Sequence, residues 1–370
     1  MKIVEVISDT NIGGAGILLA NRLECTDLEK YPTCVFLPNG SRLIPRLNRI
    51  GVEVISIDCV GDRSWNVGDV KKYKKALENI KPNIVNCHGC LSARVAAKMV
   101  RVPIKICTRH CVFPVERKDM AFGTVNDWLS DAFIAVADSA KQNLLELGIN
   151  ERKIHVIING AKALRKVSEN EKREVRTRLG ITNTAVVLVM CARLEKCKGH
   201  RYLLGALKQL EAAGIDCVAI LVGEGSERQA LERACRELGI EKRVIFVGFT
   251  DDVAPYISIA HININCSVGT ETSSLALSEG MSLGLPAVVS DYGGNPYMVR
   301  DGVNGYVYPK GSADDLAECI KRLIQDKETY KKMRLSALER FEEELNCQAM
   351  TQKTNRLYDR LLNQSQRTGF

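Results

Sequence analysis

Residues 261–309 constrain the fold more than any other stretch of the chain. His261–Asn265 alternates apolar and polar residues as a short strand does. An acidic turn and a helical pattern follow, and then a glycine–proline stop at 284–286, an apolar strand and the double glycine at 293–294. Strand, turn, helix and strand in this order predict half of a nucleotide-binding α/β domain.

Two glutamates, Glu271 and Glu279, lie inside this stretch. The helical pattern is predicted to begin near Thr272, which places Glu271 in the turn ahead of the helix and Glu279 about two turns inside it. The free N–H groups and positive dipole end of such a helix favour an anion such as a sugar diphosphate. The alternative is a capping glutamate and a solvated helix glutamate, because short motifs often match by chance.

The rest of the chain repeats the same alternation of strands and helices. With 370 residues, it is long enough for two domains with separate cores. Apolar strands and helical segments alternate over residues 1–160, and a second series begins near residue 184. Such repetition predicts two mostly parallel, doubly wound sheets, which bind ligands at the carboxyl ends of their strands.

Three of these predicted strand ends carry residues suited to binding. The first strand leads into Gly13 and Gly14, where backbone could approach a phosphate or sugar closely. His88 and His110 follow the strands at 83–86 and 104–107. A hydrogen-bonded loop position is the alternative for either histidine. The Gly13–Gly14 turn lacks the full spacing of a dinucleotide-binding fingerprint, and Gly223, in a later turn, is equally explained as a turn former.

The strand at 184–191 runs into a loop that carries Arg193, Lys198 and Gly199. A forked guanidinium and an ammonium at a strand end would stabilise the charge of a departing diphosphate. The alternative is a solvated basic loop, which is common in proteins.

Together these motifs resemble the signature of family 4 glycosyltransferases, which are retaining enzymes with the GT-B fold. The resemblance extends from Gly13 to Gly305 and rests on the paired glutamates, the Arg-x4-Lys-Gly element and the Gly-Gly loop. It implies two Rossmann-like domains facing a central cleft: an acceptor-binding domain over residues 1–162 and a nucleotide-sugar domain over 163–345. It also implies a final helix, 346–370, that crosses back to the first domain.

The resemblance implies a role for each matching residue. The catalytic group would be His110, Glu271, Arg193 and Lys198. Donor binding would involve Gly14, Arg193, Lys198, Gly223, Glu271, Ser273, Ser274 and Glu279, while Gly13 and His88 would lie on the acceptor side. In the family, the residue matching Glu279 holds the ribose, Glu271 and His110 face the sugar, and no metal or other cofactor is needed.

The function implied is transfer of a sugar from a nucleotide-diphosphate-sugar, with UDP favoured, to a hydroxyl acceptor in polysaccharide or glycolipid synthesis. A sugar-nucleotide epimerase of the same fold and an inactive sugar-binding subunit are the alternatives. The chain departs from the family at Thr272 and Ser273, where glycine and phenylalanine are usual, and at Tyr297, near which the family has a glutamate. These changes border the sugar pocket, so they bear on which sugar is transferred.

Composition limits the partners and the compartment. The net charge of +8 suits a sugar nucleotide or an anionic membrane surface, and no motif for nucleic acid accompanies it. A cytoplasmic protein is expected, since no apolar run has the length of a membrane span and no signal peptide is recognisable. Residues 71–75 together with Phe113, Phe122 and Trp128 are candidates for membrane contact, with a solvated helix and core aromatics as the alternative.

The fourteen cysteines are expected to be reduced thiols, mostly buried in apolar patterns. One group of cysteines and histidines is a candidate metal site, because these side chains follow two successive predicted strands. Its members are Cys87, His88, Cys90, Cys107, His110 and Cys111. A zinc site would need all of these ligands to aim at one point, so free thiols are the expected state.

Overall fold

The computed structural model describes residues 1–10, 13–112, 115–116 and 119–367. The chain divides into two compact units. Unit 1 comprises Met1–Ala161 and Cys347–Phe370, and unit 2 comprises Lys162–Asn346.

Unit 1 is built on a seven-stranded parallel sheet with the order β3-β2-β1-β4-β5-β6-β7. Its strands are β1 (Ile3–Ile7), β2 (Thr33–Pro38), β3 (Glu53–Ile57), β4 (Ile84–His88), β5 (Ile104–Arg109), β6 (Ala132–Ala135) and β7 (Ile154–Val156). Its helices are α1 (Gly14–Glu24), α2 (Ile44–Ile50), α3 (Val67–Ile80), α4 (Leu91–Met99), α5 (Asp119–Leu129), α6 (Asp138–Glu146) and α15 (Cys347–Arg367).

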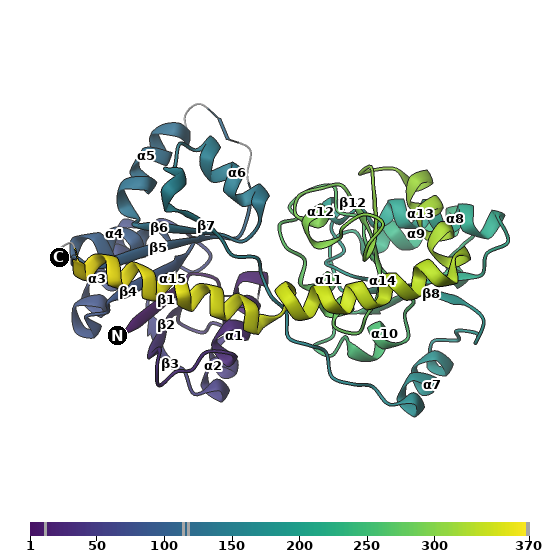
Figure 1. The fold of residues 1–370 in the computed structure, drawn as a ribbon, viewed down its shortest axis with the longest axis horizontal. Helices are drawn as coiled ribbons and strands as arrows, with labels where there is room; N and C mark the ends of the chain where they lie inside the picture. Colours follow the sequence, from purple (N-terminus) through teal and green to yellow (C-terminus); the bar gives the residue numbers. More distant parts are fainter. Residues whose placement is uncertain (11–12, 113–114, 117–118, 368–370) are drawn as a thin grey trace. The chain divides into compact units, whose positions relative to one another are not determined.

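Alternate side chains of the central strands pack into two separate layers. Val4 and Val6 of β1 pack with α3 and α4, whereas Ile7 packs with α1 and α2. The long helix α15 contacts α1 and β5, and Figure 1 shows it in yellow along the unit 1 sheet. Because successive strand residues face opposite sides, Glu5 lies on the same face as Ile7, toward α1.

Unit 2 is built on a six-stranded parallel sheet with the order β10-β9-β8-β11-β12-β13. Its strands are β8 (Val186–Cys191), β9 (Cys217–Val222), β10 (Val244–Gly248), β11 (Ile262–Asn265), β12 (Ala287–Ser290) and β13 (Gly305–Tyr308). Its helices are α7 (Glu169–Arg178), α8 (His200–Ala212), α9 (Arg228–Leu238), α10 (Ala254–Ser258), α11 (Leu275–Met281), α12 (Asn295–Met298), α13 (Ala313–Gln325) and α14 (Lys327–Arg340).

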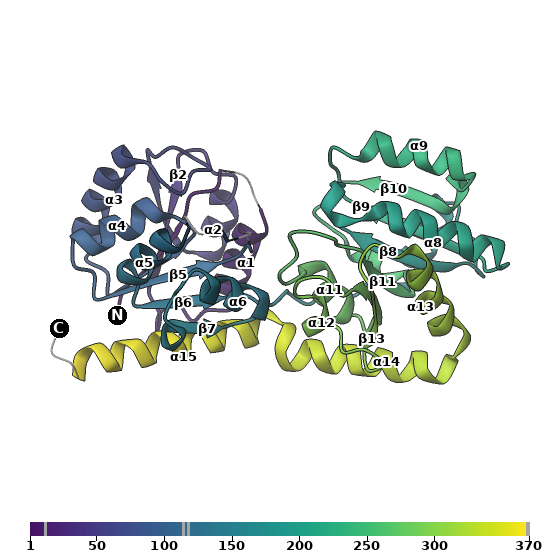
Figure 2. The same ribbon diagram turned by 90° about the horizontal axis from the view of Figure 1, so that it is seen from above.

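Both faces of the unit 2 sheet are covered. Helices α8, α9 and α13 pack on one face around Leu188 and Met190, and Figure 2 shows α8 and α9 beside β9 and β10. Helices α7 and α10 pack on the other face around Val187 and Val189. Helices on both faces of a parallel sheet leave the strand ends as the open edge where ligands bind.

Several predicted bounds of helices and strands are wrong, among them the end of the strand predicted at 104–107, which continues to Arg109. The helix predicted near Thr272 begins at Leu275, because the Ser274 hydroxyl accepts a hydrogen bond from the Leu277 amide and so caps a later start. Glu279 therefore lies little more than one turn inside α11. The strand predicted to end at Asn86 continues to His88, which pairs with both Ile7 and Thr108 in the sheet.

Within the described part of the chain, no helix is both long enough and apolar enough to cross a membrane.

Candidate active site

The carboxyl ends of β8 and β11 bring a lysine and a glutamate together in unit 2. Lys198 ends a 3₁₀ turn between β8 and α8, and Glu271 lies in the loop between β11 and α11. The Lys198 Nζ atom donates to Glu271 Oε2 at 2.9 Å. Both side chains are largely buried, at 14% and 9% exposure. Their attraction is stronger than that of a surface pair, because little water screens it.

A network of buried polar side chains contacts the Glu271 carboxylate. Asn265 Nδ2 and Ser267 Oγ donate to the same Oε2 atom at 3.1 and 2.9 Å. Asn295 Nδ2 in turn donates to Ser290 Oγ at 3.1 Å, and Ser290 donates to the Ser267 carbonyl at 2.6 Å. Together these hydrogen bonds orient the carboxylate.

The double glycine is explained by close backbone packing beside this carboxylate. Gly293 has φ +62, and a Cβ atom there would lie 2.0 Å from the Glu271 carbonyl oxygen. A Cβ atom on Gly294 would lie 1.5 Å from the Thr272 carbonyl oxygen. Larger residues would therefore displace the segment that carries Glu271.

Glu279 lies on α11 near the end of β8, where its charge contributes to raising the pKa of the Cys191 thiol, after burial itself. Burial raises the pKa of Glu279 to about 7. A half-protonated carboxyl at neutral pH is a feature that clusters at functional sites. Ser273 lies close by in sequence, and its buried hydroxyl has no hydrogen-bond partner among the described residues.

The remaining predicted donor residues occupy different surroundings. Arg193 is exposed on the loop after β8, and the described contacts do not join it to Lys198 or Glu271. Gly223, with φ +142, allows β9 to end against the Ala192 carbonyl, 2.1 Å from where a Cβ atom would lie. Glycine at position 223 is therefore required both by this backbone conformation and by the close packing. Ser274 caps α11.

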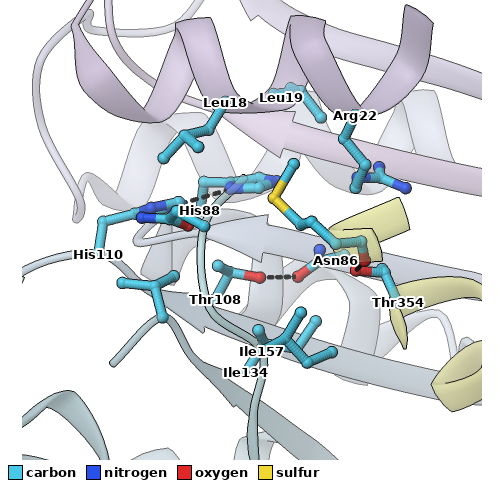
Figure 3. Close-up of a pocket in the computed structure, with 13 residues that line it drawn as sticks. Leu18, Leu19, Arg22, Asn86, His88, Thr108, His110, Ile134, Ile157 and Thr354 are labelled. Carbon is cyan, nitrogen blue, oxygen red and sulfur yellow. Dashed lines mark hydrogen bonds between the residues drawn. The ribbon is translucent and has the colours of Figure 1, made fainter. Parts of the chain in front are cut away.

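The two predicted histidines of unit 1 meet each other (Figure 3). His88 Nδ1 lies 2.7 Å from His110 Nε2, and the rings stack with centroids 5.0 Å apart. Both line a cavity of about 30 Å³, which is enough for a water molecule and too small for a sugar. Burial, followed by the neighbouring His88, lowers the pKa of His110 to about 3, so its imidazole is neutral at physiological pH.

A buried carboxylate extends this pair. His88 Nε2 lies 2.9 Å from Glu5 Oε2, while Arg22 and the Tyr358 hydroxyl donate to Glu5 Oε1, the latter at 2.8 Å. Asn86 Nδ2 donates to the Tyr358 hydroxyl at 3.1 Å. Burial would raise the pKa of Glu5, but Arg22 and the hydrogen bonds from His88 and Tyr358 outweigh it, so the pKa is lowered and Glu5 is ionised.

Gly13 and Gly14 lie at the start of α1, with Asn11 and Ile12 outside the described residues. A Cβ atom on Gly14 would meet nothing within 4 Å, and one on Gly13 would meet only Asp9 Oδ2 at 3.9 Å. Their small size is therefore not required by packing among the described residues.

The cysteines near the histidines lie on the other face of the unit 1 sheet. Cys87 and Cys107 pair in the sheet and pack in the α3/α4 and α6 layer, opposite to the face on which His88 meets Glu5. The described residues contain no group of three or more His, Cys, Asp or Glu side chains placed to hold a metal ion. Cys87 and Cys107 therefore lie on the opposite face of the sheet from the paired histidines.

Comparison with known proteins connects both units to one family. The family described as "Glycosyltransferase Family 4" matches residues 12–163, and "Glycosyl transferases group 1" matches residues 171–340. The chain is a family 4 glycosyltransferase.

Relatives and solved structures agree with this assignment. The glycosyltransferase is 27% identical over 283 residues to EpsD of Bacillus subtilis, covering 72% of this chain and 74% of EpsD. It is 25% identical over 268 residues to the Escherichia coli UDP-Gal:alpha-D-GlcNAc-diphosphoundecaprenol alpha-1,3-galactosyltransferase, covering 68% and 69%. Anabaena HepE in complex with UDP has the same fold, with a TM-score of 0.85, 21% identity, and coverage of 97% and 100%. The predicted GT-B fold is confirmed.

Sequence reasoning missed the residues that support the site of this glycosyltransferase. Asn265 and Glu5 each carried a signal, because a polar or charged residue inside an otherwise apolar strand needs a buried partner. Asn295, Ser290 and Tyr358 carried none, since their partners are remote in sequence.

Proposed function

We propose that this glycosyltransferase moves a hexosyl group from a UDP-sugar to a hydroxyl of a carbohydrate or lipid-linked acceptor, with retention of configuration and without a metal. The Lys198–Glu271 pair at the ends of β8 and β11 carries the proposal. Lys198 would stabilise the diphosphate as the glycosidic bond breaks. The UDP complex of HepE and the UDP-Gal donor named for the E. coli relative support uridine as the base.

The surroundings of Glu271 favour a hydrogen-bonding role over a nucleophilic one. Lys198, Asn265 and Ser267 all donate to Oε2, which withdraws charge from the carboxylate. Oε1 is then the atom that would accept a hydrogen bond from a sugar hydroxyl. Transfer with retention would proceed on the front face, with assistance from the donor phosphate.

A UDP-sugar hydrolysis assay tests this function without knowledge of the acceptor. The protein is incubated with UDP-glucose, UDP-galactose or UDP-N-acetylglucosamine and EDTA, and the released sugar is followed by time-resolved NMR. The α-anomer appearing first, together with UDP, is the expected result. The β-anomer first would contradict retention, dependence on added Mg²⁺ would contradict metal independence, and an epimerised sugar nucleotide without release would favour the epimerase.

We propose that Glu279 binds the ribose hydroxyls, and its raised pKa then predicts a pH-dependent affinity. An ionised carboxylate accepts hydrogen bonds from both hydroxyls, whereas the protonated form accepts fewer. With a pKa of about 7, the ionised fraction rises roughly tenfold between pH 6 and pH 8. We therefore expect the affinity for uridine, measured by calorimetry, to rise by a similar factor.

Uridine is the right probe because it lacks phosphates that titrate in this range. Glu279→Gln should abolish the pH dependence, and a dependence that survives in this variant would contradict the assignment.

The free energy of unfolding should depend on pH in the opposite direction to the affinity for uridine. A carboxyl whose pKa is raised in the folded state binds its proton more tightly there, so the free energy of unfolding falls as the pH rises from 4.5 to about 7.

The proposed cytoplasmic location at a membrane face is best supported by α5. Phe122, Val125 and Trp128 are exposed at spacings of three residues, at 50%, 47% and 64%. The Lys98 ammonium lies 4.5 Å from the centre of the Trp128 ring. Exposed apolar and aromatic residues on one face of α5, beside a lysine of α4, are typical of an interfacial membrane contact.

The lysine-rich segment of α3 supports such a contact less than its sequence suggests. Lys72 pairs with Asp58 and Asp69, Lys74 pairs with Glu78, and Tyr73 is buried in the core. Phe113 lies outside the described residues.

We expect the protein to sediment with vesicles that contain anionic phospholipid, more strongly at low salt than at high salt. The double variant Phe122→Ser/Trp128→Ser should lose most of this binding, because it removes the apolar side chains that would insert. Leu335→Ser is the matched control, since Leu335 is equally exposed, at 65%, on α14 of unit 2. Equal binding of the double variant and the control would contradict a role for α5.

A further inference from the structure

A hollow of about 510 Å³ lies in unit 2, at the amino ends of its strands. Residues 258–261, which line it, directly precede β11, and Leu283 and Leu285 precede β12. Helices α7 and α14 supply most of the remaining wall. The proposed donor residues Lys198 and Glu271 lie at the carboxyl ends of the strands, so the hollow is at the opposite edge of the sheet. Its volume is within the range of small-molecule sites, about 300–1,000 Å³.

Basic side chains form most of the charged lining of this hollow. They are Lys166, Lys172, Arg173, Arg176 and Arg334. Among the lining residues that the structure describes, Glu169 is the single acidic one, and it pairs with Lys172 at 2.8 Å. Val167, Ile259 and Leu285 are buried apolar residues of the same lining. A positively charged wall beside apolar side chains suits an anion that carries an organic part.

The two arginines at the centre of this lining are held in place by backbone oxygens. Arg176 Nη2 donates to the carbonyl oxygens of Thr182 and Ala185, the latter at 3.3 Å. Arg334 Nε donates to the Gly284 carbonyl oxygen at 3.1 Å. A carbonyl orients a guanidinium without neutralising it, and neither arginine forms an ion pair with a carboxylate of the described residues. Each guanidinium keeps further N–H groups for an anion, since it has five in all.

His261 adds a neutral donor between these charges. Its Nδ1 atom accepts a hydrogen bond from the Val187 amide at 2.9 Å. Burial, followed by the charges of Arg176 and Arg334, lowers the pKa of His261, so the ring is neutral at pH 7. A neutral imidazole that accepts at Nδ1 carries its proton on Nε2. This N–H group has no hydrogen-bond partner among the described residues, and His261 lines the hollow.

We propose that this hollow binds a small phosphate ester, with Arg176, Arg334 and His261 around the phosphate and the apolar lining against the organic part. Two guanidinium groups match the two negative charges of a phosphate monoester, and their forked N–H groups match its oxygens. The three residues come from α7, α14 and the start of β11, so the fold of unit 2 alone brings them together. The site is independent of the proposed sugar transfer.

Phenyl phosphate is the probe that tests this site. It is titrated into protein labelled with ¹⁵N-histidine, and NMR follows the signal of His261. The chain has five histidines, and His261→Gln assigns the signal. We expect a saturable shift of the His261 Nε2 resonance, and its absence would overturn the inference. Benzoate, with a single negative charge, should bind about tenfold more weakly, and equal binding would contradict the assignment to phosphate.

The variant Arg176→Ala/Arg334→Ala should weaken the binding of phenyl phosphate by about ten- to a hundredfold, because it removes hydrogen bonds to a charged group. Arg178→Ala/Lys331→Ala is the matched control. It removes two exposed positive charges from the same two helices, outside the hollow, and should leave the affinity within a factor of about two. Equal weakening in both would mean that net charge alone attracts the anion. If the first variant does not fold, Arg334→Gln is compared with Lys331→Gln.

Two further measurements exclude other places and sources for the phosphate. Lys198→Ala should leave the affinity seen at His261 unchanged, since Lys198 lies at the other edge of the sheet. Loss of the His261 shift in this variant would overturn the inference. Dihexanoyl phosphatidic acid, below its micellar concentration, distinguishes a lipid headgroup. A His261 shift with this lipid and none with phenyl phosphate would contradict a soluble ester.

Discussion

Replacing Lys198 with alanine is expected to lower turnover by about a hundred- to a thousandfold, the effect of losing one preorganised stabiliser of a developing negative charge. The lysine is largely buried, so no water takes its place at full strength. The Glu271 carboxylate keeps Asn265 and Ser267 as donors, and the protein should still fold. The release of UDP from a UDP-sugar measures the effect, with circular dichroism as the check on folding.

Two further variants in the same loop make this result specific. Lys196→Ala removes an exposed lysine two residues away and should leave turnover within a factor of two or so of wild type, since an exposed charge contributes little. Arg193→Ala should lower turnover less than Lys198→Ala. Arg193 is exposed, and the described contacts include no ion pair that positions it as Glu271 positions Lys198. Wild-type turnover in Lys198→Ala would remove Lys198 from the proposed site.

Gly293→Ala is expected to produce a large loss of stability, about 3 kcal/mol. The new Cβ atom would lie 2.0 Å from the Glu271 carbonyl oxygen, so the backbone of one segment must move. Because the displaced segment carries Glu271, the affinity for UDP-sugar should fall together with stability. Urea unfolding followed by far-UV circular dichroism measures the loss of stability. Isothermal titration calorimetry measures the affinity for the UDP-sugar.

Gly302→Ala is the matched control for this substitution. Gly302 also has positive φ, at +75, but a Cβ atom there would meet nothing within 4 Å. It should therefore show only the backbone cost of a left-handed alanine, roughly 1 to 2 kcal/mol. Equal losses in the two variants would mean that conformation alone, without close packing against Glu271, requires glycine at 293.

The order of strands and helices could be predicted from the sequence because it depends on local patterns. The apolar strand predicted at 184–191 is found as β8, Val186–Cys191, and the loop after it carries the charged residues. In a parallel sheet the carboxyl ends of all strands lie along one edge, so Lys198 and Glu271 could be assigned to that edge before any contact was known. The helix start after Glu271 was wrong because it depends on a serine cap and on the packing of the double glycine against the turn.

By itself, the sequence determined the fold class, the family and the edge of each sheet at which binding residues gather. Only the tertiary structure decided which of those residues meet. Lys198 and Glu271 are 2.9 Å apart, and Glu5 meets Tyr358 of α15, although each partner lies on a different element. Hydrophobic periodicity reports whether a residue is buried and on which face of its own element. It carries no information on which distant side chain lies opposite, because that depends on how separately formed layers pack together.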